Sequence, residues 1–438
     1  MAAVPETTEI EIVSRETIKP STPTPPGSIG LSLFDQLCPV LYVTVLFVYP
    51  PAGEGGSADK ARRLKSSLAD VLTRYYFLAG RIKDGSRSVE CNDEGAAFIE
   101  AKVNCTLEAM LSKPELPVLK RLFPIDMESM EAASGLLLLV QANLFECGGL
   151  AVGVAISHKL CDGSTMSSFI EAWTRTARNP DETLAPDFSL PTLFPPLDNR
   201  VVHNPVEELP KGLCATRRYV FDSSKVSELK RNATSAAVPV PSHVEAVSAF
   251  VWKCAANASR RSFGAPSRPS VLSQAVNLRR LLVPRLPENS VGNFIGSFHA
   301  LNSDPEAELQ QLVGKLRASS TDYVETYPRR LQEGRESAVM AVFEAGEKFA
   351  RLMMDDGLDF YNCSSWCGFG FYEADFGWGR PAWVALESTD FKNSVVLLDA
   401  GDSKGVEVWL TLRVADMEEL DHDHELLEFA SLNPGITW

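Results

Sequence analysis

The chain has 438 residues, of which 45% are hydrophobic and 23% are charged, a balance that is ordinary for a globular protein of two domains. Its formal net charge of −15 argues against nucleic acid or an anionic membrane as the main partner, because both attract basic surfaces. The nine cysteines are scattered, and the N-terminus lacks a basic flank followed by an apolar core, so we expect a reduced, cytoplasmic protein.

Residues 1–180 predict a mixed α and β domain. After a polar, proline-rich lead-in, the β-branched and aromatic run from Val40 to Tyr49 is too short to span a bilayer and predicts a buried strand. Apolar and small residues alternate over 150–157 and predict another strand. The other expected elements are a helix over residues 57–75, a hairpin whose turn is residues 92–95, and a strand over residues 136–140.

Seven prolines between Pro180 and Pro210 interrupt this pattern. Proline at this density prevents a regular helix and a central strand, so residues 181–215 predict a linker that crosses between two domains. A second mixed domain is expected over residues 216–438. Its expected elements are strands over residues 217–221 and 271–277, helices over residues 244–256 and from Asp304-Pro305 onward, and a hairpin that joins residues 395–398 to residues 406–412.

His158 has the most informative local context of the six histidines. It follows the strand predicted over 150–157 and precedes apolar residues at helical spacing from Met166 to Trp173, so it lies on a tight strand-to-helix turn. A histidine titrates near neutral pH and can take a proton from an incoming hydroxyl or amine. The spacing alone leaves an alternative, in which His158 is a hydrogen-bonded, partly buried side chain and Asp162 only caps the next helix.

A second cluster lies late in the chain, where Ser364-Ser365-Trp366-Cys367 is followed by Asp375-Phe376-Gly377-Trp378-Gly379-Arg380. Glycines that flank a tryptophan indicate a tight loop approached by a ligand or by another backbone, or a turn that packs onto a core. The sequence has no phosphate loop, dinucleotide-binding turn, nucleophile elbow or paired metal-binding histidines. Cys363 and Cys367 lack a second cysteine pair at zinc spacing, so no metal is expected.

The two clusters together resemble the signature of the plant BAHD acyl-CoA-dependent acyltransferases. His158-x-x-x-Asp162-Gly163 and Asp375-Phe376-Gly377-Trp378-Gly379 carry the resemblance and stand in the order of the family. Shorter blocks extend it over nearly the whole chain, among them Asn277-Leu278-Arg279 and Val291-Gly292-Asn293. The pattern is most similar to the vinorine synthase-like branch of alkaloid and terpenoid O-acetyltransferases.

The resemblance implies an α/β fold, with two similar-sized mixed α/β domains of the chloramphenicol acetyltransferase type and an active-site channel between them. It also implies that part of residues 375–402 packs with the N-terminal domain. In such a protein His158 is the general base of the channel. Asp162 is structural and pairs with Arg279, and Asp375, although often named beside the histidine, gives structural support.

Further roles follow from the same resemblance. Ser364 and Trp366 match the hydroxyl and indole that stabilise the oxyanion, although the family commonly has Thr where Ser364 stands. Phe34 stands where Leu is expected, which should change the shape of the acceptor pocket. The candidates for binding the CoA co-substrate are Arg380, Lys253 and Ser242.

The resemblance implies transfer of an acyl group, with acetyl favoured, from acyl-CoA to a hydroxyl of a plant specialised metabolite. The reaction is a direct attack within a ternary complex, with His158 as the base. The acceptor would be a small alcohol of the alkaloid, terpenoid or phenolic class, and the protein a monomer that needs no metal, nucleic acid or membrane. Two alternatives remain: transfer to an amine at the same site, and a member of the fold that binds a ligand or partner without turnover.

Overall fold

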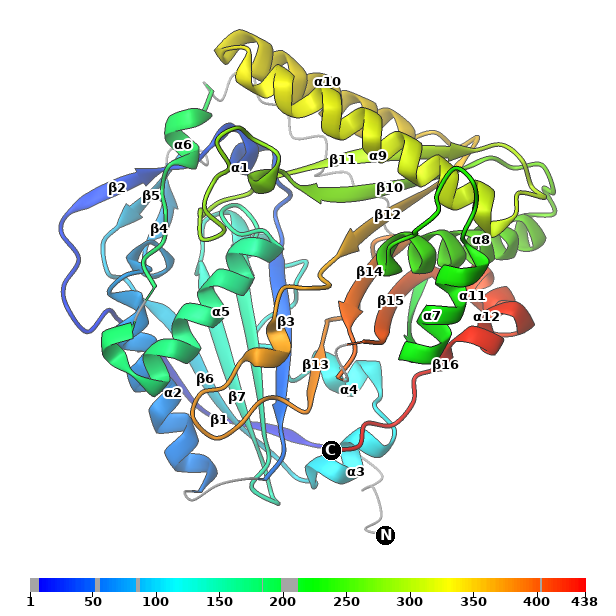
Figure 1. The fold of residues 1–438 in the computed structure, drawn as a ribbon. Coiled ribbons are helices and arrows are strands. Elements are labelled where there is room, and N and C mark those ends of the chain that lie inside the picture. Colours follow the sequence, from blue (N-terminus) through cyan, green and yellow to red (C-terminus); the bar gives the residue numbers. More distant parts are fainter. Residues whose placement is uncertain (1–7, 52–55, 84–86, 183, 198–211, 402–403) are drawn as a thin grey trace.

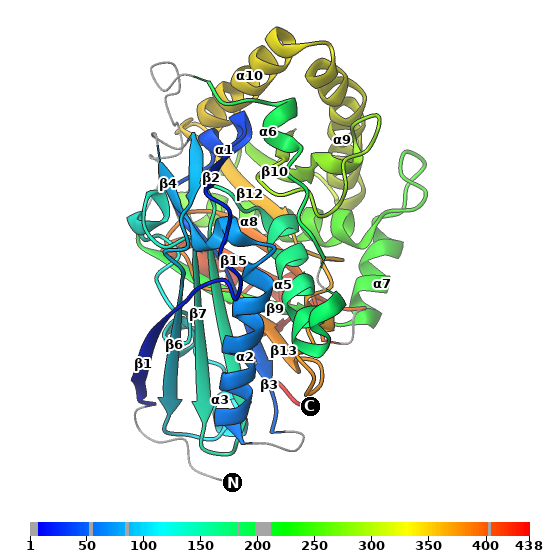
Figure 2. The same cartoon turned by 90° about the vertical axis from the view of Figure 1, so that its left-hand side faces the viewer.

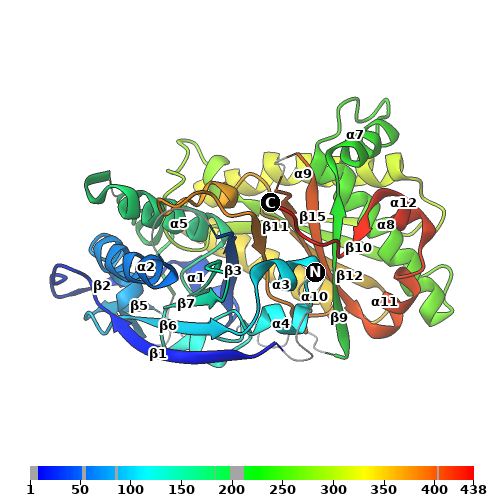
Figure 3. The ribbon, with the colours of Figure 1, turned by 90° about the horizontal axis from the view of Figure 1, so that it is seen from below.

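Two large β-sheets organise the chain, and each is built mainly from one half of it (Figure 1). The computed structural model describes residues 8–51, 56–83, 87–182, 184–197, 212–401 and 404–438. Viewed from below, the two halves lie beside each other (Figure 3). No helix among the described residues is long and apolar enough to cross a membrane.

The first sheet has six strands, which in spatial order are β1 (Ile10–Ile18), β6 (Ala96–Val103), β7 (Leu138–Phe145), β8 (Leu150–Ser157), β3 (Tyr42–Tyr49) and β13 (Trp383–Ala385). All residues of β3 are buried, as the apolar run from Val40 to Tyr49 predicted. β8 lies where the alternation over 150–157 predicted a strand, and all of its residues are buried too. Helices α2 (Ser57–Leu72) and α5 (Gly163–Arg178) cover one face of this sheet (Figure 2).

The second sheet has seven strands, which in spatial order are β11 (Ile295–Asn302), β10 (Ser270–Asn277), β12 (Asp359–Ser365), β14 (Ser394–Asp399), β15 (Val406–Arg413), β9 (Cys214–Phe221) and β16 (Ser431–Leu432). β14 and β15 form the hairpin predicted from their sequence. The larger helices of this half are α7 (Ser223–Asn232), α8 (His243–Phe263), α9 (Leu309–Gln332), α10 (Arg335–Met353), α11 (Val414–Leu420) and α12 (His424–Phe429).

Shorter elements fill the edges of the molecule. A separate three-stranded sheet contains β2 (Gly27–Gly30), β5 (Ser88–Cys91) and β4 (Arg81–Lys83). The short helices are α1 (Leu33–Leu37), α3 (Leu107–Ser112), α4 (Leu116–Lys120) and α6 (Leu190–Leu193), with 3₁₀ turns η1 (Tyr76–Ala79), η2 (Met130–Ala133), η3 (Pro180–Glu182), η5 (Leu278–Arg280) and η6 (Phe371–Glu373).

Strand β13 carries the second half of the chain into the first sheet. Trp383 pairs with Val48, and the aromatic residues just before β13 belong to the apolar core of the first sheet. The chain then returns to the second sheet as β14. Residues around 375–402 therefore contribute to both sheets. The division into domains of residues 1–180 and 216–438 stays a prediction, and residues 198–211 of the expected linker lie outside the described residues.

Two local predictions are wrong. Residues 92–95 do not form a hairpin turn, because β5 belongs to the small sheet and β6 to the large one. The positive φ angles of Asp93 (51°) and Gly95 (98°) turn the chain from one sheet to the other. Helix α9 begins at Leu309 with Glu308 as its N-cap. The Asp304 carboxylate instead accepts the Glu306 N–H at 3.0 Å in a turn before the helix.

Candidate active site

His158 lies on the turn between β8 and α5, where the sequence places it. Its backbone N–H donates to the Leu41 carbonyl at 2.8 Å, which continues the pairing of β8 with β3 and fixes the turn. The side chain lines a cavity of about 390 Å³ whose walls come from both halves of the chain. A short strand-to-helix turn therefore presents the imidazole where the two halves meet.

Asn293 sets the protonation pattern of the His158 ring. The Asn293 side-chain N–H₂ donates to the Asp35 carboxylate at 2.9 Å and to the His158 carbonyl at 2.6 Å. Both partners are acceptors, so the amide oxygen must face His158 Nδ1, which lies 2.9 Å away. Nδ1 therefore donates its proton to Asn293, and the lone pair is on Nε2. This is the tautomer that can take a proton from a substrate.

The support of Asn293 is itself buried. The backbone N–H of Asn293 donates to Asp35 at 2.6 Å, while the Ser32 N–H and hydroxyl each donate to the other Asp35 oxygen at 2.7 Å. Burial raises the pKa of Asp35 above its ordinary value, although these hydrogen bonds oppose the shift. Helix α1 thus holds the amide that orients the His158 ring.

Acyl transfer is expected to remain active below pH 6.5. Burial lowers the pKa of His158 below its ordinary value of 6.5, although the Asp162 charge opposes the shift. If His158 is the base, as the family resemblance implies, the neutral ring is the active form, so activity is present above the lowered pKa and lost as the pH falls through it. The test is kcat/KM measured between about pH 5 and 9, because its pH dependence reports the free protein, with circular dichroism showing that the protein stays folded. An acid-limb midpoint above 6.5 would contradict the assignment of His158 as the base.

Asp162 forms a buried ion pair with Arg279. Its two carboxylate oxygens accept from the guanidinium at 2.7 and 3.1 Å, and one of them also accepts the Phe294 N–H at 3.0 Å. It is also the N-cap of α5, accepting the Thr165 N–H at 2.8 Å. Burial alone would raise the pKa of Asp162, but the Arg279 charge and these hydrogen bonds hold it below its ordinary value. Asp162 thus joins α5 to the segment that carries Asn293.

Ser364 reaches the His158 cavity from the second sheet, whereas Trp366 lies beside the start of α5 and is not among the described residues that line the cavity. Ser364, on β12, lines the same cavity as His158. The Trp366 indole nitrogen would lie 3.4 Å from a Cβ at Gly163, the first residue of α5. Phe369 would lie closer still, at 2.6 Å, so only glycine leaves room for this loop beside the His158 turn. The structure therefore brings Ser364 and Trp366 to the region of His158.

Asp375 organises a loop away from this cavity. Its carboxylate accepts the Gly377 N–H at 2.7 Å and the Gly379 N–H at 2.9 Å, and both glycines have positive φ angles, 101° and 108°. The Asp375 carbonyl accepts from Arg178 of α5 at 2.6 Å. Asp375 is not among the residues that line the His158 cavity. Its contacts are those of a residue that shapes the Gly/Trp loop.

The three candidates for CoA binding are dispersed. The Ser242 hydroxyl accepts the Glu245 N–H at 3.1 Å as the N-cap of α8. Lys253 lies eleven residues further on, about 16 Å along the helix, and pairs with Glu425 at 2.8 Å. Arg380 is exposed and pairs with Glu373. None of the three lines the His158 cavity.

The cavity is mainly apolar. Its apolar walls include Phe34, the residue expected to change the shape of the acceptor pocket, and Phe349 of α10. Among the described residues that line the cavity, Lys392 has the one charged side chain apart from a protonated His158. No carboxylate of the described residues lines the cavity. The Asn393 side chain is 2% exposed and its Oδ1 has no hydrogen-bond partner. A bound molecule can therefore bury apolar surface here.

Sequence reasoning did not identify Asn293, Asp35 or Asn393 as functional residues. Asn293 ends the family block Val291-Gly292-Asn293, and Asp35 follows Phe34, but the contacts between Asn293 and Asp35 span 258 positions of the chain. Gly292, with a φ of 115°, was a usable signal, because a Cβ there would lie 3.2 Å from both Asp35 oxygens.

Comparison with known proteins identifies the family. The model of the Transferase family, the family of the BAHD acyltransferases, matches residues 8–427. Akuammiline synthase 1 of Alstonia scholaris is 36% identical over 97% of this chain and 98% of that protein. Epi-neemfruitin B 7-O-acetyltransferase of Melia azedarach is 34% identical over 98% and 99%. The crystal structure of vinorine synthase matches with a TM-score of 0.83 and 31% identity over 97% of this chain and 99% of that one.

The chain therefore belongs to the BAHD acyltransferase family. The match to vinorine synthase confirms the predicted fold class, a mixed α/β architecture of the chloramphenicol acetyltransferase type. It is also consistent with the predicted branch of the family.

Proposed function

We propose that the protein transfers an acyl group from acyl-CoA to a hydroxyl of a small apolar metabolite, with His158 as the general base. The observation that carries this proposal is the His158–Asn293–Asp35 arrangement, which leaves the lone pair on Nε2 of a histidine that lines a cavity between both halves of the chain. The family supplies the donor class. Acetyl is the favoured acyl group, because two relatives are named O-acetyltransferases.

The reaction needs no covalent intermediate on the protein. Nε2 of His158 takes the proton of the acceptor hydroxyl, and the hydroxyl oxygen attacks the thioester carbonyl. Ser364 and Trp366 donate hydrogen bonds to the oxyanion that forms. When the oxyanion collapses, the C–S bond breaks, and the His158 imidazolium returns its proton to the CoA thiolate. Asp162 and Arg279 hold the turn, and Asp375 holds the loop after Trp366.

The acceptor is proposed to be an uncharged, largely apolar alcohol. A cationic amine would be buried in a cavity that holds Lys392 and no carboxylate among its described lining residues, which is unfavourable. Arg380, Lys253 and Ser242 are proposed to bind the phosphates and adenosine of CoA. The protein is proposed to be a monomer in the cytoplasm.

The test is incubation of the purified protein with acetyl-CoA and a panel of polycyclic alcohols, each in a neutral and an amine-bearing form. We expect acetyl esters, detected by mass spectrometry together with released CoA, from the neutral alcohols. Ser364→Ala should lower kcat by about 10²–10³-fold, because one oxyanion donor is lost. Ser364→Thr keeps the hydroxyl and should retain activity. CoA release without an ester, or amides as the only products, would overturn the proposal.

A further inference from the structure

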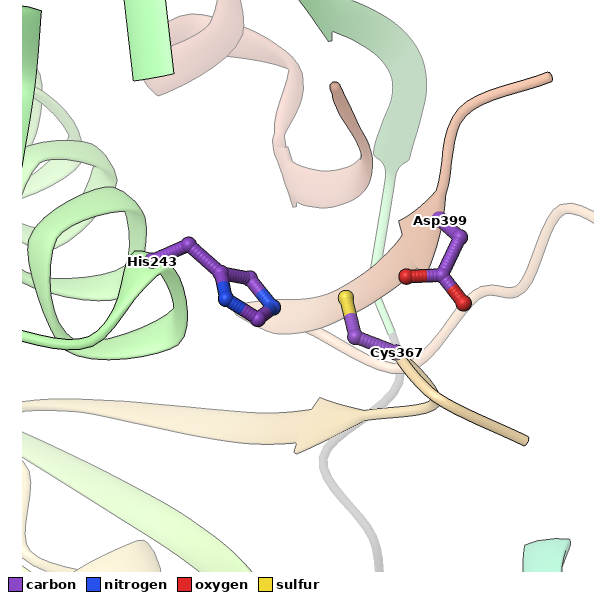
Figure 4. A group of neighbouring side chains, drawn as sticks. All are labelled: His243, Cys367 and Asp399. Carbon is purple, nitrogen blue, oxygen red and sulfur yellow. The ribbon is translucent and has the colours of Figure 1, made fainter. Parts of the chain in front are cut away.

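Three side chains of types that can ligate metals converge from separate parts of the second half of the chain (Figure 4). His243 is the first residue of α8, Cys367 follows β12, and Asp399 is the last residue of β14. One ligand atom from each side chain, the imidazole nitrogen, the sulfur or a carboxylate oxygen, lies within 4.8 Å of the other two. Within the described part of the chain this is the single group of its kind.

We propose that His243, Cys367 and Asp399 form a binding site for Zn²⁺. Imidazole, thiolate and carboxylate are the three protein ligands of zinc, whereas Mg²⁺ and Ca²⁺ select oxygen alone. Bonds of about 2.0–2.3 Å around a tetrahedral ion place the ligand atoms about 3.5 Å apart. The three atoms now lie within 4.8 Å of one another, so the site requires them to move closer, and His243 is exposed.

The Asp399 carboxylate is held in place by a hydrogen bond, and the charges of the ligands would neutralise that of Zn²⁺. The Gly368 N–H donates to one Asp399 oxygen at 2.8 Å, which orients the carboxylate as an outer partner does in metal sites. Zn²⁺ would displace the thiol proton to solvent, and the ion with one thiolate and one carboxylate is then neutral. The fourth position is left for water or a small ligand.

The wide spacing of the three residues along the chain explains why the sequence did not predict a metal site. Sequence spacing shows a site when the ligands are close in the chain, as in paired cysteines. Here residues 243, 367 and 399 are brought together by the fold alone, and Cys363 is buried against Ser248 instead. A bound ion would tie α8 and β14 to the loop that begins at Trp366. The proposal does not depend on the acyl acceptor or on turnover.

The test is titration of Zn²⁺ into the metal-free full chain, measured by calorimetry. In a second experiment the cysteines are alkylated with and without Zn²⁺ and the products are read out by mass spectrometry. We expect one bound ion and protection of Cys367, while the exposed Cys147 stays reactive as the internal reference. His243→Ala should weaken Zn²⁺ binding at least tenfold. His424→Ala is the matched control, because His424 is likewise an exposed first residue of a helix, α12.

Three results would overturn the proposal. They are unchanged Zn²⁺ affinity in His243→Ala, Cys367 alkylation that Zn²⁺ does not slow, and equal protection by Mg²⁺. Cys367→Ser is the second ligand variant, Asp399→Asn replaces it if it does not fold, and circular dichroism checks each protein. Weakened binding in His243→Ala and in the second ligand variant, with His424→Ala unchanged, would support the site.

Discussion

Replacing His158 with alanine is expected to lower kcat for acyl transfer by about 10²–10⁴-fold, the usual contribution of a general base. Asn293 holds Nδ1 at 2.9 Å, so the proton taken from the acceptor must go to Nε2. Alanine removes this proton acceptor but adds no bulk to the cavity. Acceptor and acyl-CoA should therefore still bind, and the loss should fall on kcat more than on KM.

The measurement is initial-rate kinetics of CoA release and ester formation on the wild-type protein and the variants. His158→Asn is a second variant that keeps a polar side chain but cannot take a proton from the acceptor, because an amide is not a base near neutral pH. The exposed His422, whose Nδ1 lies 2.9 Å from the Glu418 carbonyl, provides a surface control as His422→Ala. Turnover by His158→Ala equal to wild type, with an unchanged circular dichroism spectrum, would remove His158 as the base.

The strand-to-helix turn around His158 could be predicted because its signals are local. The alternating residues of β8 and the helical spacing of α5 lie on either side of the turn, and both elements were found. The mistaken hairpin at residues 92–95 shows the limit of such signals. A turn pattern shows that the chain reverses, but the partner of each strand is decided by the sheet it joins, here β2 and β4 for β5.

Contacts between distant segments could not be read from residue types alone. The Asp162–Arg279 pair was expected only from the family resemblance, and the structure shows it across 117 positions. The Asn293–Asp35 support of His158 depends on an amide orientation that appears once both of its acceptors are placed. The cavity has the same origin, because Phe34 and Phe349 meet there from opposite halves of the chain.

Breaking the Asp162–Arg279 pair from one side is expected to lower the free energy of unfolding by about 3–5 kcal/mol. Both side chains are almost completely buried, so either Asp162→Asn or Arg279→Met leaves its former partner desolvated and uncompensated. The double variant should lose less than the sum of the single losses, because no charge is then left unpaired. The lowered pKa of Asp162 gives the pH dependence: its stabilisation is present above the ordinary value of 3.8 and is lost as the pH falls through the lowered pKa.

The measurement is urea unfolding of the four proteins of this cycle, followed by tryptophan fluorescence. The neighbouring residue supplies the control, because Arg280 pairs with Glu288 at 2.6 Å on the surface, where both side chains are more than half exposed. Arg280→Met should therefore change the free energy of unfolding by less than about 1 kcal/mol. If Asp162→Asn were as stable as wild type and still inactive, Asp162 would act in the chemistry itself. Loss of stability together with activity, recovered in part by the double variant, would identify the pair as the support that holds the His158 turn against Asn293.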